Sequence, residues 1–183
     1  DDFGCEWETT APLTVVQTPV VDLGEDVALC EMYSVELDAG NESPTASYAW
    51  SPTGDTTRVI TAQTHANSNS VIKYEVLVTE YNGSIYCYGR DSINLIVHPA
   101  AIAAFTSDKF PLEGCEPYSF QLQNTATNAQ TFEWHVGEES STDPNPSFTF
   151  PYGSYDIKLK VTSEHGCKDS IEYSDIINVY RHP

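Results

Sequence analysis

The chain has 183 residues, of which 27 are acidic and 8 are basic, so its formal net charge is −19. This length accommodates one large domain or two small ones, and a hydrophobic share of 40% excludes wholesale disorder. The excess of carboxylates argues against nucleic acid and anionic lipid as partners, because both are bound through clustered Lys and Arg. No apolar run approaches the roughly 20 residues of a membrane helix, so membrane insertion is not expected.

An internal repeat is visible when the chain is aligned on its cysteines. In each of two copies a pair of cysteines brackets one tryptophan, and the two sets are Cys30, Trp50, Cys87 and Cys115, Trp134, Cys167. None of the cysteines has the C-x-x-C spacing of a zinc or redox site. Wide spacing favours structural disulfides and an oxidising compartment, with buried free thiols as the alternative.

The first 19 residues are interpreted as the end of a preceding copy. Cys5 precedes Cys87 by nearly the same distance as Cys87 precedes Cys167, about 80 residues. Cys5 is therefore expected to be the second cysteine of a truncated copy in a longer array, although an intermolecular bridge or a reactive thiol is the alternative. The predicted domains are this tail (1–19) and two complete copies, 20–99 and 100–183.

The copy over 20–99 consists of short strands separated by turns. Turn-forming residues occupy 38–41, 51–55 and 81–83. Before the last of these turns, Tyr74 begins an alternation of apolar and polar residues that is typical of a strand with one buried face. The final strand, predicted over 92–97, runs into a short junction that contains a proline.

The copy over 100–183 repeats this order. Its first strand is predicted over 102–106, and Trp134 and Tyr155 lie in later strands with the same alternation. No stretch of the chain shows a 3.6-residue period with caps, so little helix is expected. Units of about 80 residues with many short strands predict an all-β fold class of tandem immunoglobulin-like β-sandwiches.

A cysteine pair that brackets a tryptophan is the signature of a sandwich in which a buried Trp packs against a bridge between two sheets. The spacing therefore predicts a Cys30–Cys87 bond and a Cys115–Cys167 bond. Each bond would contribute about 4 kcal/mol by the chain-entropy relation. The predicted core residues are Trp50, Trp134, Tyr74 and Tyr155, and stacking on a sugar is the alternative role for the two tryptophans.

Several motifs of the second copy are typical of one family of sandwiches. They are the segments 114–117 (GCEP), 132–137 (FEWHVG), 145–150 (NPSFTF) and 153–161 (GSYDIKLKV). This copy resembles a PKD domain, the immunoglobulin-like fold of polycystic-kidney-disease repeats. The family's usual W-x-F-G-D-G stretch appears here as WHVGEE, which departs from it at Asp-Gly.

The first copy carries the segments 23–26 (LGED) and 48–54 (YAWSPTG). It is similar to the Ig-like repeats of large surface proteins of Bacteroidetes, which often precede a gliding-motility-associated, type IX secretion sorting domain. The resemblance implies a secreted or cell-surface location and a part in adhesion. It also implies O-glycosylation, because three Asp-Ser/Thr-apolar segments fit the pattern that Bacteroidetes use. The acceptors would be Thr56, Ser92 and Ser170.

The sequence contains no recognisable catalytic set, so the chain is not expected to be an enzyme. Its histidines form neither H-x-x-x-H nor H-E-x-x-H, and there is no G-x-S-x-G elbow or Gly-rich phosphate loop. Calcium is the one cofactor considered, because hard cations take several oxygen ligands. Two acidic clusters are the candidates, Asp22, Glu25, Asp26 and Glu138, Glu139, Asp143. Neither has EF-hand spacing, and solvated acidic loops are the alternative.

The function predicted from these observations is a non-catalytic spacer in a large adhesin-like protein of the cell surface or exterior. Its partners would be the neighbouring repeats of the same longer chain, and its stiffness would come from disulfides and short proline-containing junctions. One alternative is a module that binds polysaccharide or protein through the loops at a sandwich end. A further alternative is an accessory module of a secreted hydrolase.

Overall fold

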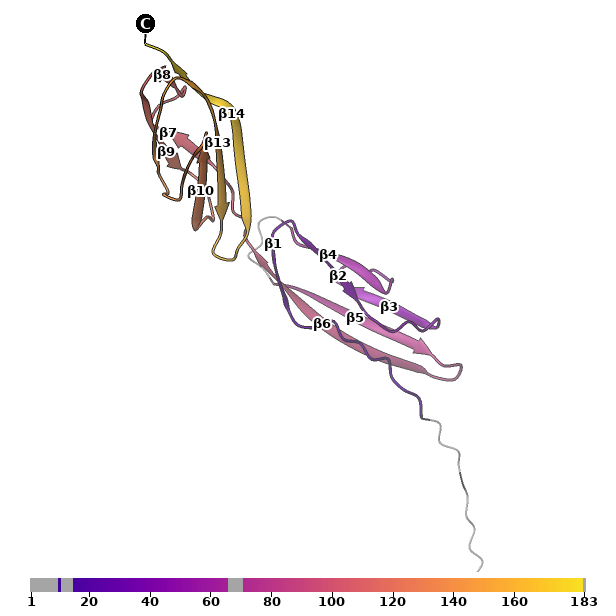
Figure 1. The fold of residues 1–183 in the computed structure, drawn as a ribbon. Helices are drawn as coiled ribbons and strands as arrows, with labels where there is room; N and C mark the ends of the chain where they lie inside the picture. The colour runs from indigo at the N-terminus through magenta and orange to yellow at the C-terminus, as the bar shows by residue number, and fades with distance from the viewer. Residues whose placement is uncertain (1–9, 11–14, 66–70, 183) are drawn as a thin grey trace, which may run out of the picture. The chain divides into compact units, whose positions relative to one another are not determined.

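The computed structural model describes residues 10, 15–65 and 71–182 (Figure 1). Every regular element in these ranges is a β-strand, which confirms the predicted all-β class. The Cys5 prediction lies outside the described residues.

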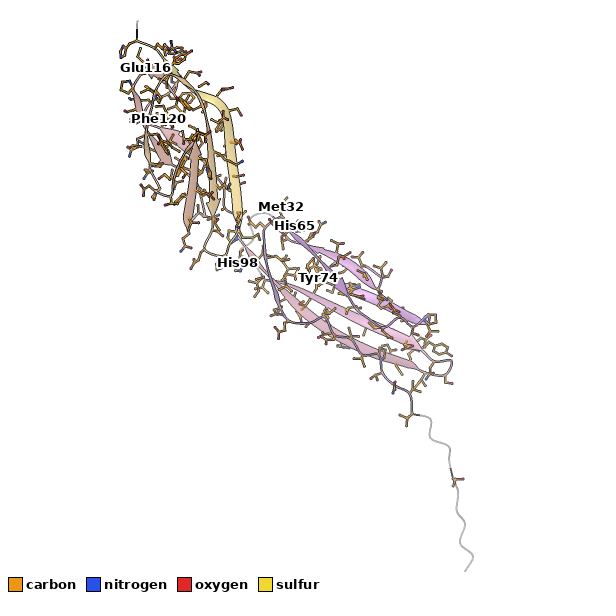
Figure 2. All side chains as sticks on the ribbon, viewed as in Figure 1. Met32, His65, Tyr74, His98, Glu116 and Phe120 are labelled. Atoms are coloured by element: carbon orange, nitrogen blue, oxygen red, sulfur yellow. A yellow bond between two sulfur atoms is a disulfide. The ribbon has the colours of Figure 1, made fainter. Side chains whose placement is uncertain are left out.

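Strands β1 to β6 build the first pair of sheets. Their bounds are β1 (Val27–Cys30), β2 (Ser34–Asp38), β3 (Ala46–Ser51), β4 (Val59–Gln63), β5 (Val71–Tyr81) and β6 (Tyr86–His98). One sheet has the order β1-β6-β5-β3 and the other pairs β2 with β4. On β5 the side chains of Tyr74, Val76 and Val78 are buried at every second position, because successive residues of a strand point to opposite faces. Figure 2 labels Tyr74 on this strand.

Strands β7 to β14 build the second pair of sheets. Their bounds are β7 (Phe105–Ser107), β8 (Glu113–Cys115), β9 (Tyr118–Asn124), β10 (Thr131–Val136), β11 (Glu139–Ser141), β12 (Ser147–Phe150), β13 (Gly153–Thr162) and β14 (Lys168–Tyr180). The sheets have the orders β11-β10-β13-β14-β8 and β12-β9-β7. Two facing antiparallel-rich sheets in each copy give the predicted immunoglobulin-like β-sandwich.

Each sandwich keeps one tryptophan in its interior and ties the indole to a loop. Trp50 is 3% exposed and its Nε1–H donates to the carbonyl oxygen of Thr57 at 2.8 Å. Trp134 is fully buried and its Nε1–H donates to the carbonyl oxygen of Asp143 at 2.9 Å. Buried indoles with a satisfied N–H are core residues, so neither ring is placed to stack on a sugar.

Tyr155 packs against the core of its sandwich and is partly buried. It shares one face of β13 with the buried Ile157 and Leu159, so the predicted alternation continues along this strand. Its ring stacks on Phe150 at 4.3 Å between centroids, and its hydroxyl donates to the carbonyl oxygen of Pro151. The pairing of β13 with β14 shifts register between Tyr155 and Ile157, but the extra residues of this β-bulge are on β14, so the faces of β13 are unchanged.

Each copy also contains a short strand that runs parallel to its long last strand. β1 pairs with β6 so that Cys30 lies opposite His98, and β8 pairs with β14 so that Cys115 lies opposite Tyr180. The first cysteine of each copy is therefore located at the C-terminal end of the last strand. The second cysteine lies at or just before the N-terminal end of that same strand.

The chain divides into two compact units. The first comprises the residues through Asp26, Val35–Ala62 and Lys73–Asn94, and the second comprises Val27–Ser34, Gln63–Ile72 and Leu95–Pro183. β1 and the end of β6 thus belong to the second unit. The predicted domain boundaries at 19–20 and 99–100 stay predictions.

Candidate functional site: the Cys30–Cys167 disulfide

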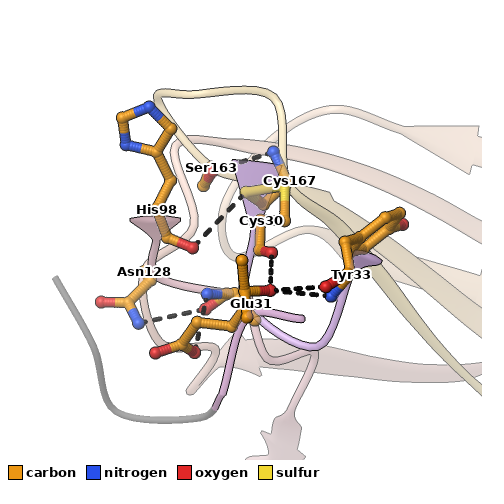
Figure 3. The surroundings of a disulfide bond; sticks show 9 residues. Cys30, Glu31, Tyr33, His98, Asn128, Ser163 and Cys167 are labelled. Atoms are coloured by element: carbon orange, nitrogen blue, oxygen red, sulfur yellow. Dashed lines mark hydrogen bonds between the residues drawn. A yellow bond between two sulfur atoms is a disulfide. The ribbon is translucent and has the colours of Figure 1, made fainter. Parts of the chain in front are cut away.

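A disulfide bond between Cys30 and Cys167 is the most prominent chemical feature of the second unit (Figure 3). The two Cα atoms are 5.7 Å apart, within the usual range for disulfides. Cys30 is held at the end of β1, where the N–H of Glu31 donates to the carbonyl oxygen of His98 at 2.9 Å. The bond therefore starts from a strand end whose position the parallel pairing with β6 determines.

Cys167 belongs to the tight turn that precedes β14. Its N–H donates to the Ser163 hydroxyl at 3.0 Å, and its carbonyl oxygen accepts from the Ser163 N–H at 2.8 Å. Gly166 adopts a φ of +81° in this turn, a conformation that favours glycine. Cys167 is 2% exposed, so its sulfur is shielded from solvent reductants.

The segment after Cys30 is fixed by a buried threonine. The Thr64 hydroxyl lies 2.8 Å from the carbonyl oxygen of Cys30 and 2.9 Å from that of Tyr33, and it accepts the Tyr33 N–H. Thr64 is 4% exposed, and a buried hydroxyl without such partners would be costly. The turn that positions Cys30 is therefore stabilised by specific hydrogen bonds as well as by strand pairing.

Further contacts surround the bond. The Glu31 carboxylate accepts the Ala100 N–H at 3.1 Å, and the rings of His98 and His165 stack with centroids 3.7 Å apart. The Cys167 sulfur lies 4.0 Å from the carbonyl oxygen of His98, which is a contact and not a hydrogen bond, since a disulfide sulfur carries no proton. The cluster is consequently a structural crosslink with packed surroundings.

Both predicted disulfide pairings are corrected by the structure. Cys30 bonds to Cys167 and not to Cys87, while Cys87 is buried without a disulfide and Cys115 is exposed without one. The reason is the parallel pairing of β1 with β6. Cys30 lies opposite His98, and Cys87 is 11 residues earlier on β6, about 36 Å away at the usual rise of a strand. The cysteines of the other copy are separated in the same way along β14.

A repeated aspartate contact, which sequence reasoning missed, holds the start of each copy. Asp91 Oδ2 accepts the Leu23 N–H at 2.8 Å in the first unit, and Asp169 Oδ2 accepts the Ala103 N–H at 2.8 Å in the second. The signal was present in the repeated Asp-Ser-Ile tripeptide. The aspartate of the predicted modification motif therefore has a structural partner in both copies.

The residues of the two predicted calcium clusters are all exposed. In the first cluster, Asp22 accepts the Gly24 N–H and Asp26 accepts both the backbone and the side-chain N–H groups of Asn94. These bonds from Asn94 hold the pKa of Asp26 below its usual range. Within the described ranges, no three His, Cys, Asp or Glu side chains are grouped so as to hold a metal ion. Calcium binding stays a prediction.

In the second cluster, Glu139 begins β11, and Asp143 uses its backbone to accept from Trp134. The Asp143 N–H donates to the Ser141 hydroxyl, which closes the loop locally. Of the predicted glycosylation acceptors, Thr56 and Ser170 are exposed and Ser92 is half-buried within β6. Modification at these hydroxyls stays a prediction.

Charged side chains on β10 and β13 form a small surface network. Glu133 Oε1 lies 2.7 Å from His135 Nε2 and 3.3 Å from Lys160 Nζ. His135 and then Lys160 lower the pKa of the Glu133 carboxyl. All three side chains are largely exposed, so the network contributes little to stability.

Two surface features of the described residues are candidates for ligand contact. A hollow of about 350 Å³ in the second unit is lined by polar and small residues, Pro99, Asn128, Ala129, Gln130, Ser163, Glu164 and His165. In the first unit, Tyr81, Tyr86 and Tyr88 are exposed at the β5–β6 hairpin, and the rings of Tyr81 and Tyr86 lie 4.8 Å apart.

No helix of the described chain is long and apolar enough to cross a membrane.

No family model and no curated protein matches the chain. Among solved structures it is similar to the PKD1 domain of the Vibrio cholerae metalloprotease PrtV, with 27% identity over 44% of this chain and 96% of that one, at a TM-score of 0.35. It is also similar to the fibronectin(III)-like modules of Clostridium thermocellum CbhA (9% identity, 86% and 90% coverage, TM-score 0.37). A third is Bacteroides ovatus SGBP-B in complex with a mixed-linkage heptasaccharide (13% identity, 93% and 46% coverage, TM-score 0.34).

Proposed function

We propose that this chain is a non-catalytic structural segment, a spacer, of a secreted or cell-surface protein. The observation that supports this role most directly is the Cys30–Cys167 bond, which closes a sequence separation of 137 residues. A disulfide is expected in an oxidising compartment, and this one encloses nearly all of both sandwiches. The Bacteroidetes setting and the type IX secretion route belong to this proposal.

The covalent topology has a mechanical consequence for a spacer. When the two chain ends are pulled apart, the tension passes from Cys30 directly to Cys167 through the sulfur atoms. Once the segments outside the bond, which include β14, are extended, the residues between the two cysteines carry no load while the bond is intact. At about 3.6 Å for each extended residue, the bond withholds about 490 Å of chain from extension.

Single-molecule force spectroscopy on the whole chain, tethered at both ends, tests this role. The oxidised chain should extend only by the short segments outside the bond, and dithiothreitol should release about 490 Å more. The Cys115→Ser variant is the matched control, because Cys115 carries no disulfide and its removal should change neither extension. An extension of the oxidised chain at low force that includes the residues between Cys30 and Cys167 would contradict the spacer role.

A second candidate function is binding of a polysaccharide through the tyrosine cluster Tyr81, Tyr86 and Tyr88. The rings of Tyr86 and Tyr88 are 61% and 57% exposed, and side chains two residues apart on a strand share one face. Exposed aromatic clusters mark interaction sites more often than isolated aromatic residues do. Affinity electrophoresis in a soluble β-glucan should show retardation that the double change Tyr86→Ala and Tyr88→Ala removes. The matched control is Tyr173→Ala, an exposed tyrosine on β14.

A further inference from the structure

Two cysteines of the described chain, Cys87 and Cys115, have no disulfide partner. Each belongs to the repeat that also supplies the bonded pair. Cys115 is the first cysteine of its copy, as Cys30 is, and Cys87 is the second of its copy, as Cys167 is. The observed bond thus joins a first cysteine to a second cysteine of a different copy, and the two free thiols are one of each kind.

The backbone presents Cys115 as it presents Cys30. Cys30 ends β1 opposite His98, and the next residue, Glu31, donates its N–H to the His98 carbonyl oxygen at 2.9 Å. Cys115 ends β8 opposite Tyr180, and Glu116 donates its N–H to the Tyr180 carbonyl oxygen at the same 2.9 Å. Cys115 is therefore fixed at a strand end in the geometry of a bonded cysteine, and its side chain is exposed.

The packing of Gly114 against the Tyr118 ring also holds Cys115 in position. A Cβ on Gly114 would lie 2.4 Å from the Tyr118 ring, so the backbone before Cys115 packs directly against that ring. A thiol on a well-held strand end loses little conformational freedom when it forms a bond, which favours pairing with a matching partner.

Cys87 resembles Cys167 in burial and in its neighbourhood. Cys87 is 9% exposed and Cys167 is 2% exposed, and each precedes the aspartate that holds the start of its copy. Cys87 is four residues before Asp91, whereas Cys167 is two residues before Asp169. An offset of two residues keeps the side chain on the same strand face but moves it about 7 Å along the strand.

Space is present beside Cys87. A hollow of about 440 Å³ is lined by this cysteine with Val15, Val16, Gln17, Glu80 and Asn82. In the second unit the strand end that carries Cys30 lies beside Cys167 and bonds to it. A buried thiol that borders an open hollow can be reached by a projecting strand end, although it is shielded from bulk reagents.

We propose that Cys115 and Cys87 each form a disulfide of the Cys30–Cys167 type with a cysteine of another repeat of this kind. Cys115 pairs with the second cysteine of that repeat and Cys87 with the first. When only this chain is present, the matching partner is a second copy, and the bond joins Cys115 of one copy to Cys87 of the other. This inference does not depend on the spacer role, since it rests on the equivalence of the cysteines.

The chemistry is a two-electron oxidation. The two thiols lose two protons and two electrons, and one S–S bond forms between their sulfur atoms. A disulfide oxidant such as glutathione disulfide accepts the electrons by thiol–disulfide exchange and leaves as two molecules of glutathione. No other atoms change.

The test uses two variants of the whole chain, each with Cys5→Ser to remove a competing thiol. One also carries Cys87→Ser, so that Cys115 is its free thiol, and the other carries Cys115→Ser, so that Cys87 is free. Each variant alone and an equimolar mixture are incubated in a glutathione redox buffer. Non-reducing electrophoresis and peptide mapping by mass spectrometry then identify the bonds, with the Cys30–Cys167 peptide as the control for a native fold.

The mixture should give a covalent heterodimer with a Cys115–Cys87 peptide, in at least tenfold excess over either homodimer. The chain with Cys5→Ser alone should give a ladder of longer oligomers, because each copy then carries both kinds of thiol. A Cys115–Cys115 homodimer that forms as readily as the heterodimer would overturn the proposal. So would a mixture that stays monomeric while the Cys30–Cys167 bond is intact.

Discussion

The double variant Cys30→Ser and Cys167→Ser tests how much the observed disulfide stabilises the second unit. A crosslink acts mainly by lowering the entropy of the unfolded chain, and the effect grows with the length of the loop that it closes. For a separation of 137 residues the chain-entropy relation gives about 5 kcal/mol at 25 °C. Measured effects often fall below this value, so a loss of about 2–5 kcal/mol is expected.

Equilibrium unfolding in guanidinium chloride, followed by tryptophan fluorescence, measures this loss. Trp134 is fully buried in the second unit and reports on its unfolding. In a thermal scan the same loss corresponds to a lower Tm by about 4–8 °C for each kcal/mol, the conversion for a unit of about 100 residues. Wild-type chain that is reduced with dithiothreitol in denaturant and kept reduced should match the double variant.

The Cys115→Ser variant is the matched control for this experiment, since the side chain is exposed and unbonded. It should change the free energy of unfolding by no more than about 0.5 kcal/mol. A double variant that stays within about 0.5 kcal/mol of the wild type would refute the reasoning, because the crosslink would then add nothing to the strand pairing around it.

Three further predictions follow from the described contacts. Trp134→Ala should cost about 3–5 kcal/mol in urea unfolding, because it leaves a cavity in the core, and a cost below about 1 kcal/mol would contradict that role. Gly114→Ala should cost about 1–3 kcal/mol, measured in the same way, since a Cβ at 114 meets the Tyr118 ring. Stability should fall between about pH 5 and pH 2. In the folded chain the pKa values of Asp26, Asp108 and Glu133 lie below their usual range, so the unfolded chain binds more protons there. Urea midpoints that rise on acidification would refute this.

Much of the fold was predictable because its signals are local. Alternation at Tyr74, Val76 and Val78 has a period of two, and burial of one strand face follows from that period alone. The partial exposure of Tyr155 was not predictable, because it depends on how far other segments, such as the one that carries Phe150, cover its ring. The tyrosine cluster at the β5–β6 hairpin was missed for a similar reason, since its exposure depends on what the sheets leave uncovered.

The disulfide pairing failed on strand order. The Cys…Trp…Cys signature assumes that the first cysteine and the tryptophan lie on strands that follow one another. Here a whole strand stands between them, β2 between Cys30 and Trp50 and β9 in the other copy. The cysteine is therefore one strand too early, on the short strand that runs parallel to the last one.

The strand that carries the first cysteine determines which disulfides are possible in any copy with the same strand order. Parallel pairing places the first cysteine at the C-terminal end of the last strand, and the second cysteine is at the N-terminal end of that strand. At 13 residues, β6 and β14 are each about 40 Å long, whereas a disulfide needs Cα atoms within about 7 Å. The two cysteines of one copy therefore cannot bond to each other without unfolding the sandwich. A disulfide that either of them forms is therefore with a cysteine of a different copy, as the bond of Cys30 with Cys167 is.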